Sequence, residues 1–325
     1  MPEAQHRIVS HGSIDLDVTF AGTGPLVLMV HGFPESAWSW RHQIASLAAA
    51  GYTAAALDVR GYGASSSPPD VADYAAAAMT ADLVAVIDAF GAERAVLVGH
   101  DKGSGIVQAA SLLAPDRVAG VALLSVPTAA WIDGLPSERI RAAGRDTFYY
   151  QAYFLEPGVA ERELEADLDR FLRTFFHALS AASHDPLYAL MRPHPSAGLL
   201  DDLPEPGDAM DAWMSPHDLR TFADAFRAGG LTGPLHRYRA IDVEWEQLRP
   251  YRDQQIAAPG LFVAGTLDPV RRLGPPGVDR YADPVARFAD PRGSHLLDGV
   301  GHWTQQEAPD QVDALLLDFL GGLDR

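Results

Sequence analysis

The segment Ala95-Val-Leu-Val-Gly-His-Asp-Lys-Gly-Ser104 joins a short apolar run to an acidic residue with a glycine two positions before it and another two positions after it. A continuous apolar run of this length is typical of a strand that is covered on both faces of a sheet. Glycines on either side permit a strained turn, because they have no Cβ atom to obstruct the backbone. The segment therefore predicts a buried strand, a tight turn that exposes the Asp101 side chain, and a helix that starts near Ser104.

Similar apolar runs lie on both sides of this segment. They cover residues 25–30, 53–57, 121–126, 260–264 and 294–297. Two stretches of helical period, residues 38–50 and 79–90, lie between the early runs, and each is followed by a glycine suited to a helix C-terminus. Strands that alternate with helices predict a parallel sheet with right-handed crossovers.

Two further parts of the chain depart from this alternation. Apolar and polar residues alternate over residues 14–20, which predicts an opening strand of the antiparallel type. Residues 129–245 are mostly helical in period, with a proline-rich break over 193–206. We therefore expect an α/β core formed by residues 1–128 and 246–325, with residues 129–245 inserted as a helical cap, and an amphipathic helix over 310–320.

Composition excludes several classes of function. There are 25 Lys and Arg against 43 Asp and Glu, a formal net charge of −18, so we expect neither a nucleic acid nor a membrane surface as a partner. The chain has no cysteine, which excludes disulfides and a thiol nucleophile. No uncharged stretch is long enough to span a bilayer, and we expect a cytoplasmic protein. The histidines of the inserted segment lack ligand spacing, so we expect no metal and no cofactor.

Three candidate catalytic residues follow three different apolar runs: Asp101, Asp268 and His302. Ligands gather outside the carboxyl ends of parallel strands, where these residues would lie. Taken alone, each has a structural explanation as a tight turn, a helix cap or a loop histidine. Together, their order of nucleophile, acid and histidine matches the chain order of α/β-hydrolase triads, which favours a catalytic triad.

An aspartate in the position of the nucleophile restricts the reaction. A carboxylate that attacks an ester carbonyl would form an anhydride, whereas its attack on a saturated carbon forms an ordinary ester. This argues against esterase, lipase and peptidase activity. Opening of an epoxide and displacement of a halide remain.

In these motifs the chain resembles the epoxide hydrolase branch of the α/β-hydrolases. The resemblance is carried by His31-Gly-Phe-Pro34, the Asp101 turn, Leu124-Ser-Val-Pro127, Tyr149-Tyr-Gln-Ala-Tyr-Phe-Leu-Glu-Pro-Gly158, Leu235-His-Arg-Tyr238, Asp268 and His302. It implies an α/β-hydrolase fold: a mostly parallel, eight-stranded sheet with helices on both faces and an inserted helical cap. It also implies an enzyme that converts a small-molecule epoxide and water to a vicinal diol.

The resemblance assigns a role to each candidate residue. Asp101 would form the ester, His302 would deprotonate the hydrolytic water, and Asp268 would orient His302. Backbone N–H groups of Phe33 and Lys102 would form the oxyanion hole, with a cis bond before Pro34.

Other candidates surround this triad. The cap hydroxyls of Tyr150 and Tyr238 would supply a proton or strong hydrogen bonds to the epoxide oxygen. Glu35 and His100 would order the water or, equally, support the site structurally. We expect Trp38, Gln151 and Trp303 in the substrate pocket.

Some questions stay open. A haloalkane or haloacid dehalogenase would use the same aspartate, and a non-catalytic ligand-binding relative would keep the fold alone. Lys102 replaces the tryptophan found at its position in most epoxide hydrolases, and we expect its side chain to run past the pocket wall to solvent. A homodimer is possible.

Overall fold

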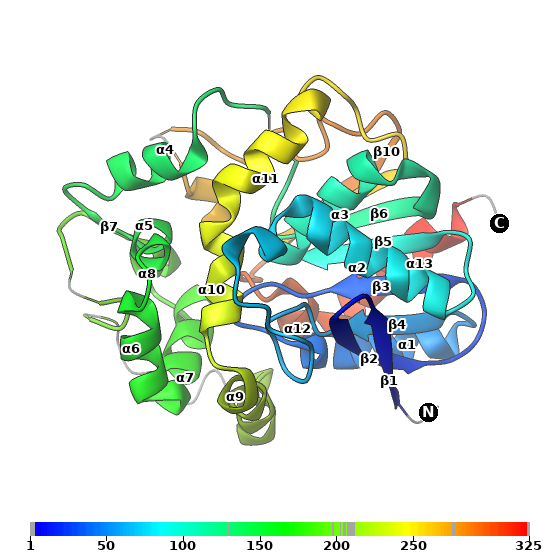
Figure 1. The fold of residues 1–325 in the computed structure, drawn as a ribbon, viewed down its shortest axis with the longest axis horizontal. Coiled ribbons are helices and arrows are strands. Elements are labelled where there is room, and N and C mark those ends of the chain that lie inside the picture. Colours follow the sequence, from blue (N-terminus) through cyan, green and yellow to red (C-terminus); the bar gives the residue numbers. More distant parts are fainter. Residues whose placement is uncertain are drawn as a thin grey trace.

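A sheet of eight strands runs through the molecule, and helices cover both of its faces (Figure 1). The computed structural model describes residues 4–128, 130–196, 198–201, 203, 206, 212–274 and 277–323. The strand order is β1-β2-β4-β3-β5-β6-β9-β10, and the pairs β1·β2 and β2·β4 are antiparallel while the others are parallel. The predicted fold class, a mostly parallel eight-stranded sheet of the α/β-hydrolase type, is confirmed.

Seven of these strands coincide with the runs read from the sequence, and β1 does not. The strands are β1 (Gln5–His11), β2 (Ile14–Ala21), β3 (Leu26–Val30), β4 (Thr53–Leu57), β5 (Ala95–His100), β6 (Val118–Leu124), β9 (Gly260–Gly265) and β10 (Pro291–Leu297). In β1 only Val9 is buried, so the strand lacks a regular apolar period. It forms because Gln5 to His11 pair with the edge of β2.

Alternate residues of the buried strands point to opposite faces of the sheet. In β3, Val27 and Met29 pack with α1 and α13, whereas Leu26, Leu28 and Val30 belong to the core on the side of α2 and α3. Both faces are therefore apolar, which explains the continuous hydrophobic runs.

The helices of the core follow the predicted stretches with shifted ends. They are α1 (Arg41–Ala49), α2 (Ala76–Ala89), α3 (Lys102–Leu113), α12 (Thr304–Glu307) and α13 (Pro309–Gly321), with short 3-10 helices η1 (Ala37–Trp40), η2 (Val71–Tyr74), η3 (Pro115–Arg117), η5 (Arg249–Tyr251) and η6 (Pro269–Arg272). The stretch predicted over 38–50 begins as η1, where the side chain of Ser36 accepts a hydrogen bond from the Trp38 backbone. The predicted terminal helix is α13, one residue longer at each end.

A group of helices between β6 and β9 lies beside the sheet, shown in green and yellow in Figure 1. We call this group the cap. It contains α4 (Pro136–Ala143), α5 (Tyr150–Leu155), α6 (Val159–Ala166), α7 (Leu168–Leu179), α8 (Pro186–Leu190), α9 (Pro216–Gly229), α10 (Thr232–Arg239) and α11 (Ile241–Leu248), with the short strands β7 (Phe148–Tyr149) and β8 (Met191–Arg192). The boundary expected at residue 245 falls inside α11, and parts of the proline-rich break over 193–206 lie outside the described residues.

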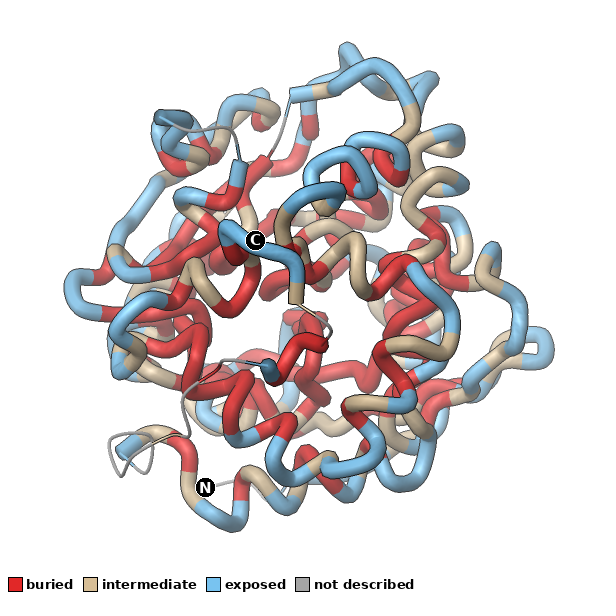
Figure 2. The backbone as a smooth tube through the Cα atoms, turned by 90° about the vertical axis from the view of Figure 1, so that its left-hand side faces the viewer, coloured by how far each residue is buried: buried red, intermediate tan, exposed pale blue. Residues whose placement is uncertain are grey.

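The apolar interior is continuous between the cap and one face of the sheet. Phe33 from the core packs edge-on against Phe154 and Tyr238 of the cap, with ring centroids 5.2 and 5.6 Å apart. Buried segments gather in the middle of the molecule and exposed ones lie mostly around its periphery (Figure 2). Within the described residues, no helix has the length and apolar character needed to cross a bilayer.

Candidate active site

The turn after β5 holds Asp101 in a strained conformation. Its φ is 50°, which L-residues with side chains rarely adopt. A Cβ atom on Gly103 would lie 2.0 Å from the Val30 carbonyl oxygen, and one on Gly99 would lie 2.5 Å from the Gly103 carbonyl oxygen. The predicted requirement for both glycines is thus explained by backbone contact on either side of the aspartate.

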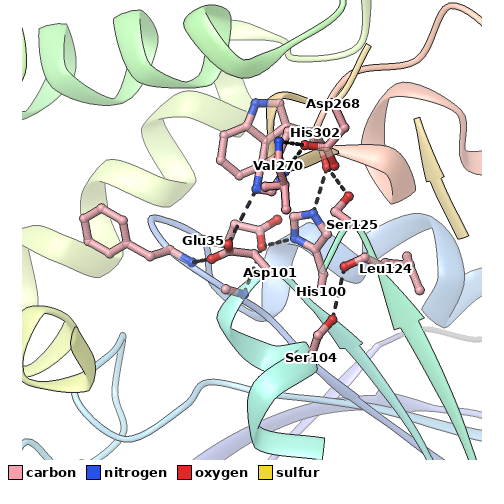
Figure 3. Close-up of polar contacts among 12 residues, drawn as sticks. Glu35, His100, Asp101, Ser104, Leu124, Ser125, Asp268, Val270 and His302 are labelled. Carbon is pink, nitrogen blue, oxygen red and sulfur yellow. Dashed lines mark hydrogen bonds and ion pairs between the residues drawn. The ribbon is translucent and has the colours of Figure 1, made fainter. Parts of the chain in front are cut away.

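Asp101, His302 and Asp268 meet at the carboxyl edge of the sheet (Figure 3). His302 Nδ1 is 3.1 Å from Asp268 Oδ1, and His302 Nε2 is 3.7 Å from Asp101 Oδ2. The first distance is a hydrogen bond, while the second is an ion pair too long for one. Asp268 Oδ1 also accepts a hydrogen bond of 2.9 Å from the Val270 backbone, which fixes the carboxylate.

Neighbouring charges shift the pKa values of Asp101 and His302 in this buried site. Burial by itself raises the pKa of Asp101, but His302, His100 and the Phe33 N–H outweigh it and hold that pKa well below its usual range. Burial lowers the pKa of His302, yet the carboxylates of Asp268 and Asp101 raise it well above its ordinary value. The two carboxylates therefore stabilise the protonated, imidazolium form of His302.

A backbone donor already contacts the Asp101 carboxylate. The Phe33 N–H donates a hydrogen bond of 3.0 Å to Asp101 Oδ1. Lys102 is the first residue of α3, so its N–H belongs to the free N-terminal donors of that helix. The Phe33-Pro34 peptide bond is cis, which confirms that prediction.

Two tyrosines of the cap lie together near the aspartate. Tyr150 and Tyr238 are both buried, and their ring centroids are 6.1 Å apart. Gln151 Nε2 donates a hydrogen bond of 2.9 Å to the Tyr150 hydroxyl, which leaves the proton of that hydroxyl available. Burial, together with the Asp101 charge, raises the pKa of both tyrosines well above 10, so they are protonated near neutral pH.

A cavity of about 180 Å³ lies against Asp101 and Tyr150, whereas Tyr238 is not among its lining residues. Asp101, Lys102, Tyr150 and Gln151 line it, as do the apolar side chains of Val126, Val270 and Leu273. The Lys102 ammonium lies 4.1 Å from the ring centroid of Tyr238. The prediction that this side chain runs past the wall to solvent is wrong, because the face of the Tyr238 ring attracts the cation and holds it at the cavity.

Glu35 and His100 form a buried network behind the triad. The Glu35 carboxylate accepts hydrogen bonds from the Gly32 backbone, His100 Nδ1, Gln305 and Gln306. The other ring nitrogen of His100 lies 2.9 Å from the His302 carbonyl oxygen, to which Ser125 also donates.

Two of the expected pocket residues do not line this cavity. The indole of Trp38 donates a hydrogen bond of 2.7 Å to Oδ1 of the buried Asp218, in the first turn of α9, and Trp38 is not among the residues that line the cavity. Trp303 is fully buried, and its indole donates to the Phe176 carbonyl oxygen at 2.7 Å. Both rings pack between the core and the cap, because each indole N–H donates a hydrogen bond to an acceptor in a cap helix, Asp218 in α9 or Phe176 in α7. Gln151 alone of the three lies at the cavity.

Three charged residues at the cavity were not predicted: Arg237, Glu244 and Arg280. Arg237 precedes Tyr238 in the motif 235–238, and that adjacency was the one available signal. Arg280 lies in a loop before β10 without any motif. Among the described residues, no three His, Asp or Glu side chains gather as metal ligands would.

Comparisons with known proteins agree with this geometry. Residues 25–270 match the family model for the alpha/beta hydrolase fold. The chain is 43% identical, over 98% of both sequences, to epoxide hydrolase A of Mycobacterium tuberculosis. Among solved structures it is similar to epoxide hydrolase A of Mycobacterium thermoresistibile, with 42% identity, a TM-score of 0.90 and 99% of each chain covered.

A second solved structure supports the same relationship. An epoxide hydrolase from an endophytic Streptomyces is 41% identical, with a TM-score of 0.91 over 98% of this chain and 96% of that one. Identities of this size across nearly whole chains exceed a likeness of fold alone. This chain is a member of the epoxide hydrolase family within the α/β-hydrolases.

Proposed function

We propose that this enzyme converts an epoxide and water to a vicinal diol through an ester between the substrate and Asp101. The observation that carries the proposal is the contact of Asp268 with His302 and of His302 with Asp101, beside a cavity that Asp101 and Tyr150 both line. A carboxylate and a phenol beside one small space support a reaction that needs a nucleophile and an acid.

The first step forms the ester. An Asp101 carboxylate oxygen attacks an epoxide carbon, and the carbon–oxygen bond of the ring breaks. The released alkoxide takes a proton from the hydroxyl of Tyr150 or Tyr238. The His302 imidazolium restores the tyrosine proton, directly or through water, so the step ends with a neutral ester, an alcohol and a neutral imidazole.

The second step hydrolyses the ester. Esterification removes the Asp101 charge, and the pKa of His302 falls because one of its two carboxylate neighbours is gone. Neutral His302 then removes a proton from water, and the hydroxide attacks the ester carbonyl. The N–H groups of Phe33 and Lys102 stabilise the resulting oxyanion. When the diol leaves, the remaining water proton neutralises its alkoxide.

Glu35 and His100 act in this scheme as structural supports. The carboxylate oxygens of Glu35 already accept four hydrogen bonds, and His100 holds the His302 backbone. Neither group presents a free acceptor for a water, so their role is to keep the imidazole in place.

The tyrosines favour epoxide opening over displacement of a halide. A halide leaves as a stable anion and needs no acid, whereas an alkoxide needs a proton. The complete triad argues against a ligand-binding relative without catalysis. A cytoplasmic location, a homodimer and the division of the chain at residues 128 and 245 stay predictions.

The decisive experiment is a single turnover of styrene oxide in heavy-oxygen water with enzyme in excess. We expect the heavy oxygen in the Asp101 carboxylate, because water attacks the ester carbonyl rather than the substrate carbon. Peptide mass spectrometry locates the label. Label found only in the diol would contradict the covalent route.

The variant His302→Gln isolates the first step. Since ester formation needs no base, we expect intact-mass spectrometry to show the protein heavier by one substrate molecule. The matched variant Asp101→Asn with His302→Gln removes the nucleophile and should show no added mass. Failure of His302→Gln to accumulate an adduct, while it remains folded, would remove Asp101 as the nucleophile.

A further inference from the structure

Three basic side chains line the cavity that contains Asp101: Lys102, Arg237 and Arg280. Only two carboxylates, Asp101 and Glu244, line it with them. The cations therefore outnumber the anions before any substrate enters. The excess grows during the reaction, because Asp101 becomes a neutral ester in the proposed first step.

The Arg237 charge is largely compensated by Glu244. Arg237 Nη1 forms an ion pair with Glu244 Oε2, and both groups lie mostly out of solvent. The Arg237 Nη2 atom also lies close to α3, 3.7 Å from the position a Cβ would take on Gly105. This guanidinium thus occupies the space beside Gly105. Because Glu244 compensates its charge, the other two cations, Lys102 and Arg280, supply the excess positive charge of the cavity.

The ammonium of Lys102 has no carboxylate within ion-pair distance among the described residues. Its neighbour is the ring face of Tyr238, 4.1 Å away. Burial, followed by the Arg237 charge, lowers the pKa of Lys102 to about 8 against the opposing effects of Asp101 and Glu244. A partly buried ammonium without an anionic partner gains free energy when an anion is added beside it.

Arg280 is the second uncompensated cation. Its backbone N–H bonds to the Arg271 carbonyl oxygen, but the guanidinium forms no hydrogen bond or ion pair with any described residue. The same side chain also lines a neighbouring surface groove, formed in part by the stacked rings of Trp131 and Trp245. Arg280 therefore lies where a substrate passing from that groove would reach Asp101.

We propose that Lys102 and Arg280 form an anion subsite and that the enzyme acts on epoxides bearing a carboxylate near the oxirane ring. The proposal rests on the function proposed above and specifies its substrate class. A carboxylate matches the single excess positive charge of the cavity. Its small size suits a space of about 180 Å³ with Val126, Val270 and Leu273 around the rest of the substrate.

The test compares 3-phenyloxirane-2-carboxylate with its neutral amide. We expect kcat/KM of the wild type to favour the carboxylate by about 10- to 100-fold, the range for hydrogen bonds to charged groups. In Lys102→Met and in Arg280→Gln the preference should fall about tenfold each. A ratio measured within one variant cancels changes in the amount of active enzyme. Should Lys102→Met not fold, Arg280→Gln carries the test, because that side chain lies in a loop.

A charge change elsewhere is the matched control. Arg252→Gln removes an exposed guanidinium that, among the described residues, forms an ion pair only with its neighbour Asp253, and the carboxylate preference should stay at the wild-type value. Equal loss of preference in this control would mean that net charge, and not the subsite, attracts the substrate. That result would overturn the proposal.

Binding separates this inference from the proposed function. Calorimetry with 3-phenylpropanoate and 3-phenylpropanamide, which cannot react, should show tighter binding of the carboxylate in the wild type and not in Arg280→Gln. Equal binding of the two compounds would overturn the anion subsite even if styrene oxide is hydrolysed. Tighter carboxylate binding without turnover of any epoxide would support the subsite and overturn the proposed function.

Discussion

The protonation of His302 depends on whether the Asp101 side chain carries a charge. In the resting enzyme two carboxylates raise the pKa of the imidazole against the effect of burial. Ester formation removes one of them. In the proposed mechanism the same residue would therefore first hold a proton and then act as a base.

This change predicts that only the second of the two steps slows toward acid pH. Asp101, whose pKa is held low by His302 and His100 against burial, stays ionised from about pH 5 to pH 7, so the rate of ester formation should be flat there. Ester hydrolysis needs neutral His302 and should slow as pH falls. Chemical quench with intact-mass analysis measures the accumulated ester, which we expect to increase toward acid pH. A steep fall in the rate of ester formation over the same range would contradict it.

The cap tyrosines are predicted to act as acids. Tyr150→Phe and Tyr238→Phe should each slow ester formation from styrene oxide by roughly 10²-fold, and the double variant should nearly abolish it. Tyr149→Phe is the matched control, because that ring packs edge-on against Tyr150 and no part in the reaction is proposed for its hydroxyl. Single-turnover kinetics give the rates. Wild-type rates in the double variant would show that these tyrosines only pack.

The turn between β5 and α3 depends on the space beside its glycines. Gly103→Ala would drive a Cβ to 2.0 Å from the Val30 carbonyl oxygen, so we expect a loss of about 2–4 kcal/mol in the free energy of unfolding. Gly105→Ala, in the same helix, meets no atom nearer than 3.7 Å and should be stabilising by about 0.5–1 kcal/mol. Urea denaturation measures both. Equal stability of the two variants would contradict the packing explanation.

At the scale of the whole molecule, Asp218 ties the cap to the core. Its carboxylate accepts hydrogen bonds from the Trp38 indole at 2.7 Å and from Ser215, and it lies 3.1 Å from Arg41 Nε. Burial raises its pKa, but these partners together hold it below the ordinary value. The stabilisation is therefore present above about pH 4 and is lost as pH falls below it.

Removal of this contact should loosen the cap. We expect Asp218→Ala to cost about 2–4 kcal/mol in the free energy of unfolding, because it leaves the mostly buried Arg41 with neutral hydrogen-bond acceptors such as Gln306 but without its carboxylate partner. Asp224→Ala, on the exposed side of the same helix, should cost less than about 1 kcal/mol. Urea denaturation at neutral pH and limited proteolysis of the cap report the two effects. An unchanged midpoint for Asp218→Ala would show that the cap is held by apolar packing alone.

Local pattern was sufficient for most of the sheet and for selecting Asp101, Asp268 and His302, which the structure brings together. The runs that form β3, β4, β5, β6 and β9 are apolar because both of their faces are covered. A continuous apolar run can be recognised in the sequence without knowing which elements cover it. The turn at Asp101 was readable for a similar reason. Close backbone contacts leave room only for glycine at positions 99 and 103, so the requirement can be recognised directly from the residue types in the sequence.

The tertiary structure alone decided where long side chains point and which distant charges meet. β1 has no period of its own and forms by pairing with β2. Lys102 is held at the cavity by Tyr238, and Arg237 and Arg280 reach the same space from a cap helix and a core loop. The direction of a flexible cation depends on the sum of ring, carboxylate and solvent contacts around it. Those contacts come from segments far apart in the chain, so no spacing in the sequence records them.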